Sequence, residues 1–310
     1  GGAAQSSCGG LSSPDEVRRQ DGQYTYTAGG QTFTKPVTFY APKAGTQTAP
    51  CPMLVLVPGG CSDKASIEWA APYLASRGYV AAAVTVNAAA AGGASAVQVC
   101  ADATVAAIGA LLSPDNPFAA DGDPSRVGAA GYSLGARALT RVQEEDRRVG
   151  AVVEFDNLAL SEDGDAGSPA CENVPGVVRA PRVPAMGQAS EMCSPEAQAG
   201  GRDAKQTALR HWKGAGQPAM QLVFAGSNHA SFGASASAAL KPYFLAYAAA
   251  WFDRWLKGDE GASERLLADT VDPGLAGVEA RTRAQLLSAT WTSGAFFDGH
   301  DCGDLLAGCP

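Results

Sequence analysis

The chain of 310 residues has the composition of a globular protein, since 46% of it is hydrophobic and only 17% is charged. Its net charge of −8, from 23 basic and 31 acidic residues, argues against nucleic acids and anionic membranes as partners. No stretch approaches the ~18 consecutive apolar residues that a membrane-spanning helix needs, so we expect no membrane association.

The hydrophobic pattern predicts alternating strands and helices after a small polar segment, 1–22, which we expect to be a surface tail. Two β-rich stretches come first, and the all-apolar run that follows them is typical of a strand inside a parallel sheet. Strands are expected at 24–27, 31–40, 53–57, 79–86, 126–130, 151–155, 183–187 and 219–224, and helices at 67–77, 100–112, 134–144, 202–213 and 240–256. This alternation predicts one α/β domain over 23–270 with a mostly parallel sheet, and a C-terminal extension over 271–310 packed on it.

Eight cysteines are present, none of them in a Cys-x-x-Cys pair, and there are only three histidines. We therefore expect no metal site, and four disulfides formed in an oxidising compartment. Pairing of Cys302 with Cys309 is the simplest, because it closes a small loop. The first ten residues resemble no signal peptide, so we expect the mature form of a secreted protein, extracellular or periplasmic.

The segment Gly131-Tyr132-Ser133-Leu134-Gly135 fits the Gly-x-Ser-x-Gly turn that presents a nucleophilic serine. The pattern alone is weak in a chain with 37 glycines, but here it follows a short strand and opens a helical segment, as that turn requires. A serine in a strained turn also needs neighbours without side chains. We expect Ser133 to be the nucleophile; the alternative is a glycine-rich turn with an incidental serine.

A nucleophilic serine needs a base, and three histidines are candidates. His229 follows the apolar strand 220–224 at its carboxyl end, where the sites of α/β proteins gather, so we expect it to be the base. His211 lies in a charged amphipathic helix and His300 between two aspartates near the C-terminus, as expected of exposed residues.

The histidine in turn needs a carboxylate that orients it, between the serine and the histidine in chain order. Glu191 follows the strand before that of the histidine, and Asp156 closes the strand after the serine turn. Position favours Glu191, with Asp156 as the alternative.

A serine nucleophile also needs two backbone N–H groups that stabilise the oxyanion formed when it attacks a carbonyl group. Leu134, directly after the serine, is expected to supply one, and Gly60, in the loop after the strand 53–57, the other. Cys61 could hold this loop still, with Cys100 as a candidate disulfide partner.

Much of the chain resembles the bacterial cutinase and PET-hydrolase family of the α/β-hydrolase superfamily. The matching stretches are Pro58-Gly59, Ser66-Ile67-Glu68-Trp69-Ala70-Ala71-Pro72-Tyr73-Leu74-Ala75-Ser76-Arg77-Gly78-Tyr79-Val80, Thr85-Val86-Asn87, Asp123-Pro124-Ser125-Arg126-Val127-Gly128, Gly187-Gln188-Ala189-Ser190-Glu191-Met192-Cys193-Ser194-Pro195 and Gly226-Ser227-Asn228-His229. The resemblance extends over roughly 24–267. It implies an α/β-hydrolase fold with helices on both faces of the sheet, an ester or polyester substrate, no cofactor, and the acid at Glu191.

Departures from the family pattern bear on the substrate. The family usually has an aspartate where Glu191 stands, an aromatic residue where Gly60 stands and a tryptophan where Leu158 stands. The two aromatic residues flank the acyl part of an aromatic polyester, so their loss predicts weak cleavage of such a polymer. Leu158, Tyr132 and Cys61 are the expected substrate contacts.

We therefore predict a secreted serine ester hydrolase of cutinase or polyester-hydrolase type that acts as a monomer. One alternative is a hydrolase for small soluble esters or another polymer with the same triad. The other is a non-catalytic binding protein on the same fold, which a fully active Ser133→Ala variant would favour.

Overall fold

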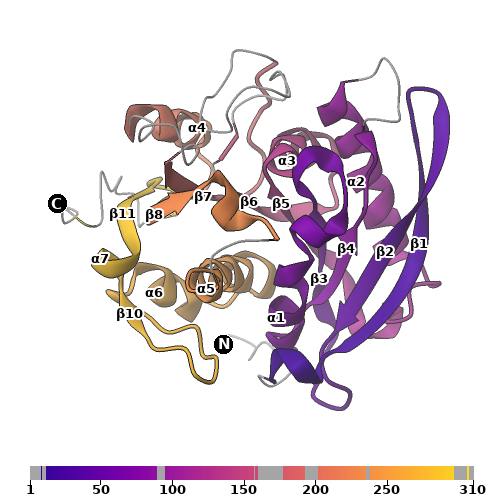
Figure 1. Ribbon diagram of the computed structural model, residues 1–310, viewed down its shortest axis with the longest axis horizontal. Helices are drawn as coiled ribbons and strands as arrows, with labels where there is room; N and C mark the ends of the chain where they lie inside the picture. Colours follow the sequence, from indigo (N-terminus) through magenta and orange to yellow (C-terminus); the bar gives the residue numbers. More distant parts are fainter. Residues whose placement is uncertain are drawn as a thin grey trace, which may run out of the picture.

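The computed structural model describes Cys8 and residues 12–88, 95–156, 158–159, 177–192, 202–234, 238–296 and Leu306, with the backbone alone over 202–205. These residues form a nine-stranded sheet in the order β1-β2-β4-β3-β5-β6-β7-β8-β11 (Figure 1). The strands are β1 Arg18–Ala28, β2 Gln31–Ala41, β3 Cys51–Val57, β4 Val80–Val84, β5 Gly122–Tyr132, β6 Val149–Phe155, β7 Ala185–Met192, β8 Ala219–Asn228 and β11 Leu287–Thr292. From β4 to β8 the neighbours run parallel, whereas β1, β2 and β11 pair antiparallel.

Helices cover both faces of this sheet (Figure 1). One face carries α2 Ala96–Leu112, α3 Leu134–Glu145 and α4 Arg202–Gly214, and the other carries α1 Ala71–Ser76, α5 Lys241–Phe252 and α6 Gly261–Leu267. A short helix, α7 Arg283–Leu286, precedes β11, and β9 Thr270–Val271 pairs with β10 Arg281–Thr282. Every residue of β3 is buried, as expected of a central strand covered on both sides. The predicted α/β-hydrolase-like architecture is thus confirmed.

Two helices are shorter than the apolar pattern predicts. The helix expected at 67–77 starts only at Ala71, after 3₁₀ turns, because Pro72 lacks an N–H and is best placed in a first turn. The helix expected at 240–256 changes into a π-helical turn over Asp253–Lys257. Gly258, at a φ of 68°, then ends it in the left-handed conformation that glycine adopts without strain.

The sheet extends further than the sequence predicted, at the start of β1 and with the additional strand β11. β1 begins at Arg18, inside the segment expected to be a tail, where Arg18 pairs with Ala41 in the sheet and forms a 2.7 Å ion pair with Asp121. β11, from the C-terminal extension, pairs with β8 and becomes an edge strand of the sheet.

The structure contains the disulfides Cys8–Cys51 and Cys61–Cys100. The second is the pairing considered from the sequence. The other four cysteines, including the proposed Cys302–Cys309 pair, lie outside the described residues. Within the described part of the chain, no helix combines the length and apolar character needed to cross a bilayer.

Candidate active site

Ser133 lies at a sharp turn between β5 and α3, with a φ of 56° and a ψ of −117°. Two glycines make the turn possible. A Cβ atom on Gly131 would lie 2.6 Å from the carbonyl carbon of Gly135, and one on Gly135 would lie 2.6 Å from the carbonyl oxygen of Val57. A side chain at Gly131 would therefore clash with the first turn of α3, and one at Gly135 would push that turn away from the end of β3.

A continuous hydrogen-bonded chain runs from Ser133 through His229 to Asp156. The Oγ atom of Ser133 lies 3.1 Å from Nε2 of His229. The other ring nitrogen, Nδ1, contacts Oδ2 of Asp156. His229 opens a 3₁₀ turn, His229–Phe232, directly after β8, and Asp156 directly follows β6. Ends of parallel strands thus bring the three side chains together at the carboxyl edge of the sheet.

The Asp156 carboxylate is almost fully buried, at 4% exposure, and its second oxygen also has a partner. Oδ1 accepts a hydrogen bond from the Ser190 hydroxyl at 2.6 Å. The backbone N–H of Asp156 donates to the Gln188 carbonyl at 2.8 Å. A buried charge with both oxygens hydrogen-bonded is tolerated, because each bond replaces one to water.

The expectation that Glu191 orients His229 needs correction, because Asp156 occupies that place. Glu191 instead accepts a hydrogen bond from the backbone N–H of Gly226 at 2.8 Å. The reason is the alternation of side chains along a strand. Ser190 points toward Asp156, so the next residue of β7, Glu191, points to the other side.

The other two histidines do not join this chain in the described structure. His211 contacts the carbonyl oxygen of Arg179 at 3.0 Å through Nε2. His300 lies outside the described residues.

The two expected oxyanion donors belong to segments that pack against each other. Gly60 lies in the 3₁₀ turn after β3, at a φ of 62°, and is exposed. Leu134 is the first residue of α3, where a helix leaves its N–H without a partner within the helix. The turn approaches the serine strand closely, since a Cβ atom on Gly59 would overlap the ring of Tyr132.

Several bonds hold the turn that carries Gly60. The backbone N–H of Gly59 donates to the Ser66 hydroxyl at 2.9 Å, and the Ser62 hydroxyl donates to the Gly59 carbonyl at 2.9 Å. The disulfide from Cys61 to Cys100 ties the same turn to α2. A fixed turn is what a preorganised oxyanion site needs.

Tyr132, which is expected to contact substrate, packs against the histidine. Its ring stacks on that of His229, with centroids 5.2 Å apart and planes at 29°. Its hydroxyl donates to the His229 carbonyl at 3.1 Å. Burial raises the pKa of Tyr132 to about 12, with a further contribution from the charge of Asp156, so the hydroxyl stays a donor at neutral pH.

The other two expected substrate contacts face the interior of the protein. Leu158 has no exposed surface and belongs to the core on the α2–α4 face of the sheet. It fits there because Gly187 has no side chain; a Cβ atom on Gly187 would lie 2.7 Å from the Leu158 nitrogen. Cys61 is 1% exposed and bonded to Cys100.

An aromatic cluster behind the serine turn was not singled out from the sequence. Trp69 packs against Phe155 at 5.7 Å between centroids, and Phe155 against Phe232 at 6.3 Å. The Nζ atom of Lys241 lies 5.1 Å from the centre of a Trp69 ring and donates to the Ala234 carbonyl at 3.1 Å. Trp69 stands in the family-like stretch, which was the available signal; nothing in the sequence pointed to Lys241.

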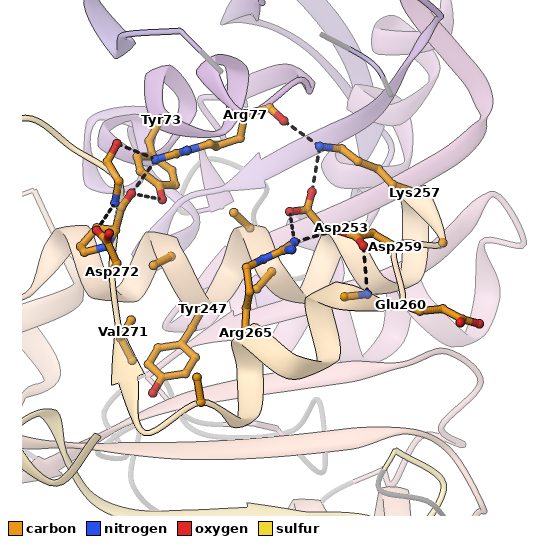
Figure 2. Close-up of a pocket in the computed structure, with 18 of the residues that line it drawn as sticks. Tyr73, Arg77, Tyr247, Asp253, Lys257, Asp259, Glu260, Arg265, Val271 and Asp272 are labelled. Carbon is orange, nitrogen blue, oxygen red and sulfur yellow. Dashed lines mark hydrogen bonds and ion pairs between the residues drawn. The ribbon is translucent and has the colours of Figure 1, made fainter. Parts of the chain in front are cut away.

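A cavity of about 880 Å³ lies elsewhere, between α1, α5, α6 and the segment 268–274 (Figure 2). Four of its charged side chains form ion pairs with one another. Arg265 bonds to Asp253 at 2.9 Å and to Asp259 at 2.8 Å, and Lys257 to Asp253 at 2.8 Å. Ser133 does not line it, so this cavity is separate from the hydrogen-bonded chain described above.

A mostly parallel sheet with a serine on the turn after β5, an aspartate after β6 and a histidine after β8 has the arrangement typical of the α/β-hydrolase class. Within that class, residues 23–162 match the PETase family model, described as PET hydrolase-like. The resemblance inferred from the sequence is therefore confirmed over these residues, which include Ser133 and Asp156. A comparison with curated proteins gives no match.

Proposed function

We propose that the protein hydrolyses carboxylic esters through an acyl-enzyme formed on Ser133. One observation carries this proposal: the Ser133 hydroxyl lies 3.1 Å from Nε2 of His229, while the opposite ring nitrogen contacts Asp156. This order of groups lets a neutral imidazole accept the serine proton while a carboxylate fixes its tautomer.

In the proposed reaction, Ser133 Oγ attacks the ester carbonyl carbon as its proton passes to Nε2 of His229. The carbonyl π bond opens to an oxyanion, which the N–H groups of Gly60 and Leu134 stabilise. The carbon–oxygen bond to the alcohol then breaks, and the imidazolium gives its proton to the departing alcohol. Water repeats the sequence on the acyl-enzyme and releases the acid and free Ser133.

For the substrate, we propose a polyester or ester whose acyl part does not need to be flanked by two aromatic side chains. The match to PET hydrolase-like proteins supports a polyester substrate. Small soluble esters, or another polymer, are the second candidate. A specific observation favours them over an aromatic polyester: Leu158, where the resemblance expects a tryptophan, is fully buried.

The test is hydrolysis of p-nitrophenyl esters with C2 to C12 acyl chains, followed by release of soluble acid from aliphatic polyester and PET films. Activity that disappears in Ser133→Ala supports the serine mechanism, and the optimum chain length measures the acyl site. Activity on films supports the polyester substrate, and activity on soluble esters alone supports the second candidate. Equal activity of Ser133→Ala and the unmodified protein would contradict the proposal.

We also propose that the protein works outside the cytoplasm, in the extracellular space or periplasm, as a monomer. The disulfides Cys8–Cys51 and Cys61–Cys100 support an oxidising compartment. Thiol titration of protein purified from its native source, together with sedimentation, measures both properties; free thiols or a dimer would contradict them.

A further inference from the structure

A carboxyl group that the proposed reaction does not use lies two residues before Asp156. Glu154, on β6, has no exposed surface. In the sheet it pairs with Gly131 on one side and with Gly187 on the other. Register partners in a parallel sheet direct their side chains to the same face. Neither neighbour has room for a side chain, because a Cβ atom on Gly131 would lie 2.6 Å from the Gly135 backbone and one on Gly187 would overlap Oε1 of Gln221.

One hydrogen bond connects this carboxyl to the backbone beyond Asp156. Oε2 of Glu154 accepts a hydrogen bond from the N–H of Ala159 at 2.5 Å. The bond joins the end of β6 to a residue three positions past Asp156. Because Asp156 has a φ of 76°, the backbone bends there, and the bond closes the bend.

The protonation state of Glu154 suits this place. Burial raises its pKa well above the ordinary value of 4.5, and the bond from Ala159 offsets this only in part. Burial therefore favours the neutral form of this carboxyl group. A neutral carboxyl can hold the Ala159 N–H without placing a second negative charge near Asp156, which would disfavour the ionised form of that group.

We propose that Glu154 is a positioning residue for the catalytic acid: by holding the N–H of Ala159, it fixes the bend that directs the Asp156 carboxylate toward His229. Its effect on turnover rests on the proposed function, whereas its effect on the geometry of Asp156 does not.

Three variants separate this role from simple packing. Glu154→Gln keeps an acceptor of the same shape, Glu154→Met keeps the length without an acceptor, and Val152→Ala removes buried volume from the same face of β6. We expect Glu154→Met to lower kcat by about 10- to 100-fold with KM within about twofold, because misaligned catalytic groups chiefly affect the chemical step. Glu154→Gln and Val152→Ala should stay within about threefold of the unmodified protein. Equal losses in Glu154→Met and Val152→Ala would overturn the proposal.

A spectroscopic readout keeps the test independent of turnover. The proton between His229 Nδ1 and Asp156 gives a far-downfield NMR resonance, which is assigned by its loss in Asp156→Asn. We expect it in the unmodified protein and in Glu154→Gln, and expect Glu154→Met to lose it although the protein stays folded by circular dichroism. Its persistence in folded Glu154→Met would overturn the proposal, even if no ester proved to be a substrate.

If Glu154→Met does not fold, hydrogen exchange of the Ala159 amide in the unmodified protein tests the proposal. Slow exchange of this amide hydrogen supports the bond to Glu154, and exchange at the rate of an unprotected amide contradicts it.

Discussion

Asp156 is held in a backbone conformation that few residues with a side chain adopt. Its φ of 76° lies in the left-handed region, as do those of Ser133 and Cys61. Aspartate tolerates this conformation better than most residues do, and such strain gathers at functional sites. All three residues lie at or beside the candidate active site, so the strained backbone conformations lie where we propose that the reaction takes place.

Tyr132 offers a test of how the histidine is held. Tyr132→Phe keeps the ring stacked on His229 and removes the hydroxyl that donates to the His229 carbonyl. One hydrogen bond contributes about 0.5–1.5 kcal/mol, so we expect kcat/KM for a p-nitrophenyl ester to fall about 2- to 10-fold. Tyr73→Phe is the matched control, because it removes a tyrosine bond to the Pro273 carbonyl beside the distant cavity. Equal effects of the two variants would refute a local role.

Some contacts of the site could be predicted from the sequence and others could not. The Gly-x-Ser-x-Gly pattern, and the position of His229 after an apolar strand, were enough to bring Ser133 and His229 together. The acid was not predictable in the same way, because Glu191 and Asp156 both follow neighbouring strands. The choice depends on the φ of Asp156 and on which side of β7 each residue faces, and a single sequence gives neither.

The helices and strands likewise include some that could be predicted from the sequence and some that could not. β3 and α3 were predicted because a run of apolar residues and a glycine-flanked serine are strong local signals. β1 before Gly22 and β11 were missed, because edge strands alternate weakly and depend on distant partners for pairing. The late start of α1 could have been inferred from Pro72.

The disulfide between Cys61 and Cys100 is expected to serve catalysis as well as stability. It ties the turn of Gly60 to α2, whereas Cys8–Cys51 joins a different part of the chain. Their sequence separations, 39 and 43 residues, are similar. Replacing either pair with serines should therefore cost a similar amount of stability, about 4 kcal/mol in the chain-entropy view.

Activity should distinguish the two disulfides. We expect only Cys61→Ser/Cys100→Ser to lower kcat, by about tenfold, which is less than the ~10²–10³ lost with a whole oxyanion donor. Steady-state kinetics at a temperature where both variants remain folded is the measurement. A comparable loss in Cys8→Ser/Cys51→Ser would show that the effect is general loosening.

Stability of the chain should depend on pH through Glu154. Its pKa in the folded state lies well above 4.5, whereas in the unfolded chain it returns to about that value. Between these two values the folded state binds one more proton than the unfolded state does, so the free energy of unfolding falls as pH rises. The contribution is fully present below the unfolded pKa and is lost as pH approaches the folded pKa.

Glu154→Gln lacks this titration. Denaturant unfolding at pH 5 to 8 should therefore show the unmodified protein losing stability relative to Glu154→Gln, by up to about 1.4 kcal/mol per pH unit. A difference between the two proteins that does not change with pH would mean that Glu154 does not titrate on unfolding in this range.

The most direct test of the proposed triad compares Asp156→Asn with Glu191→Gln on a soluble p-nitrophenyl ester. Asn keeps the shape of the side chain but cannot stabilise the histidine in the tautomer that accepts the serine proton. We predict that Asp156→Asn lowers kcat by about 10³- to 10⁴-fold, and that Glu191→Gln, which keeps an acceptor for the N–H of Gly226, stays within about threefold. An inactive Glu191→Gln together with an active Asp156→Asn would contradict the account and restore Glu191 as the acid.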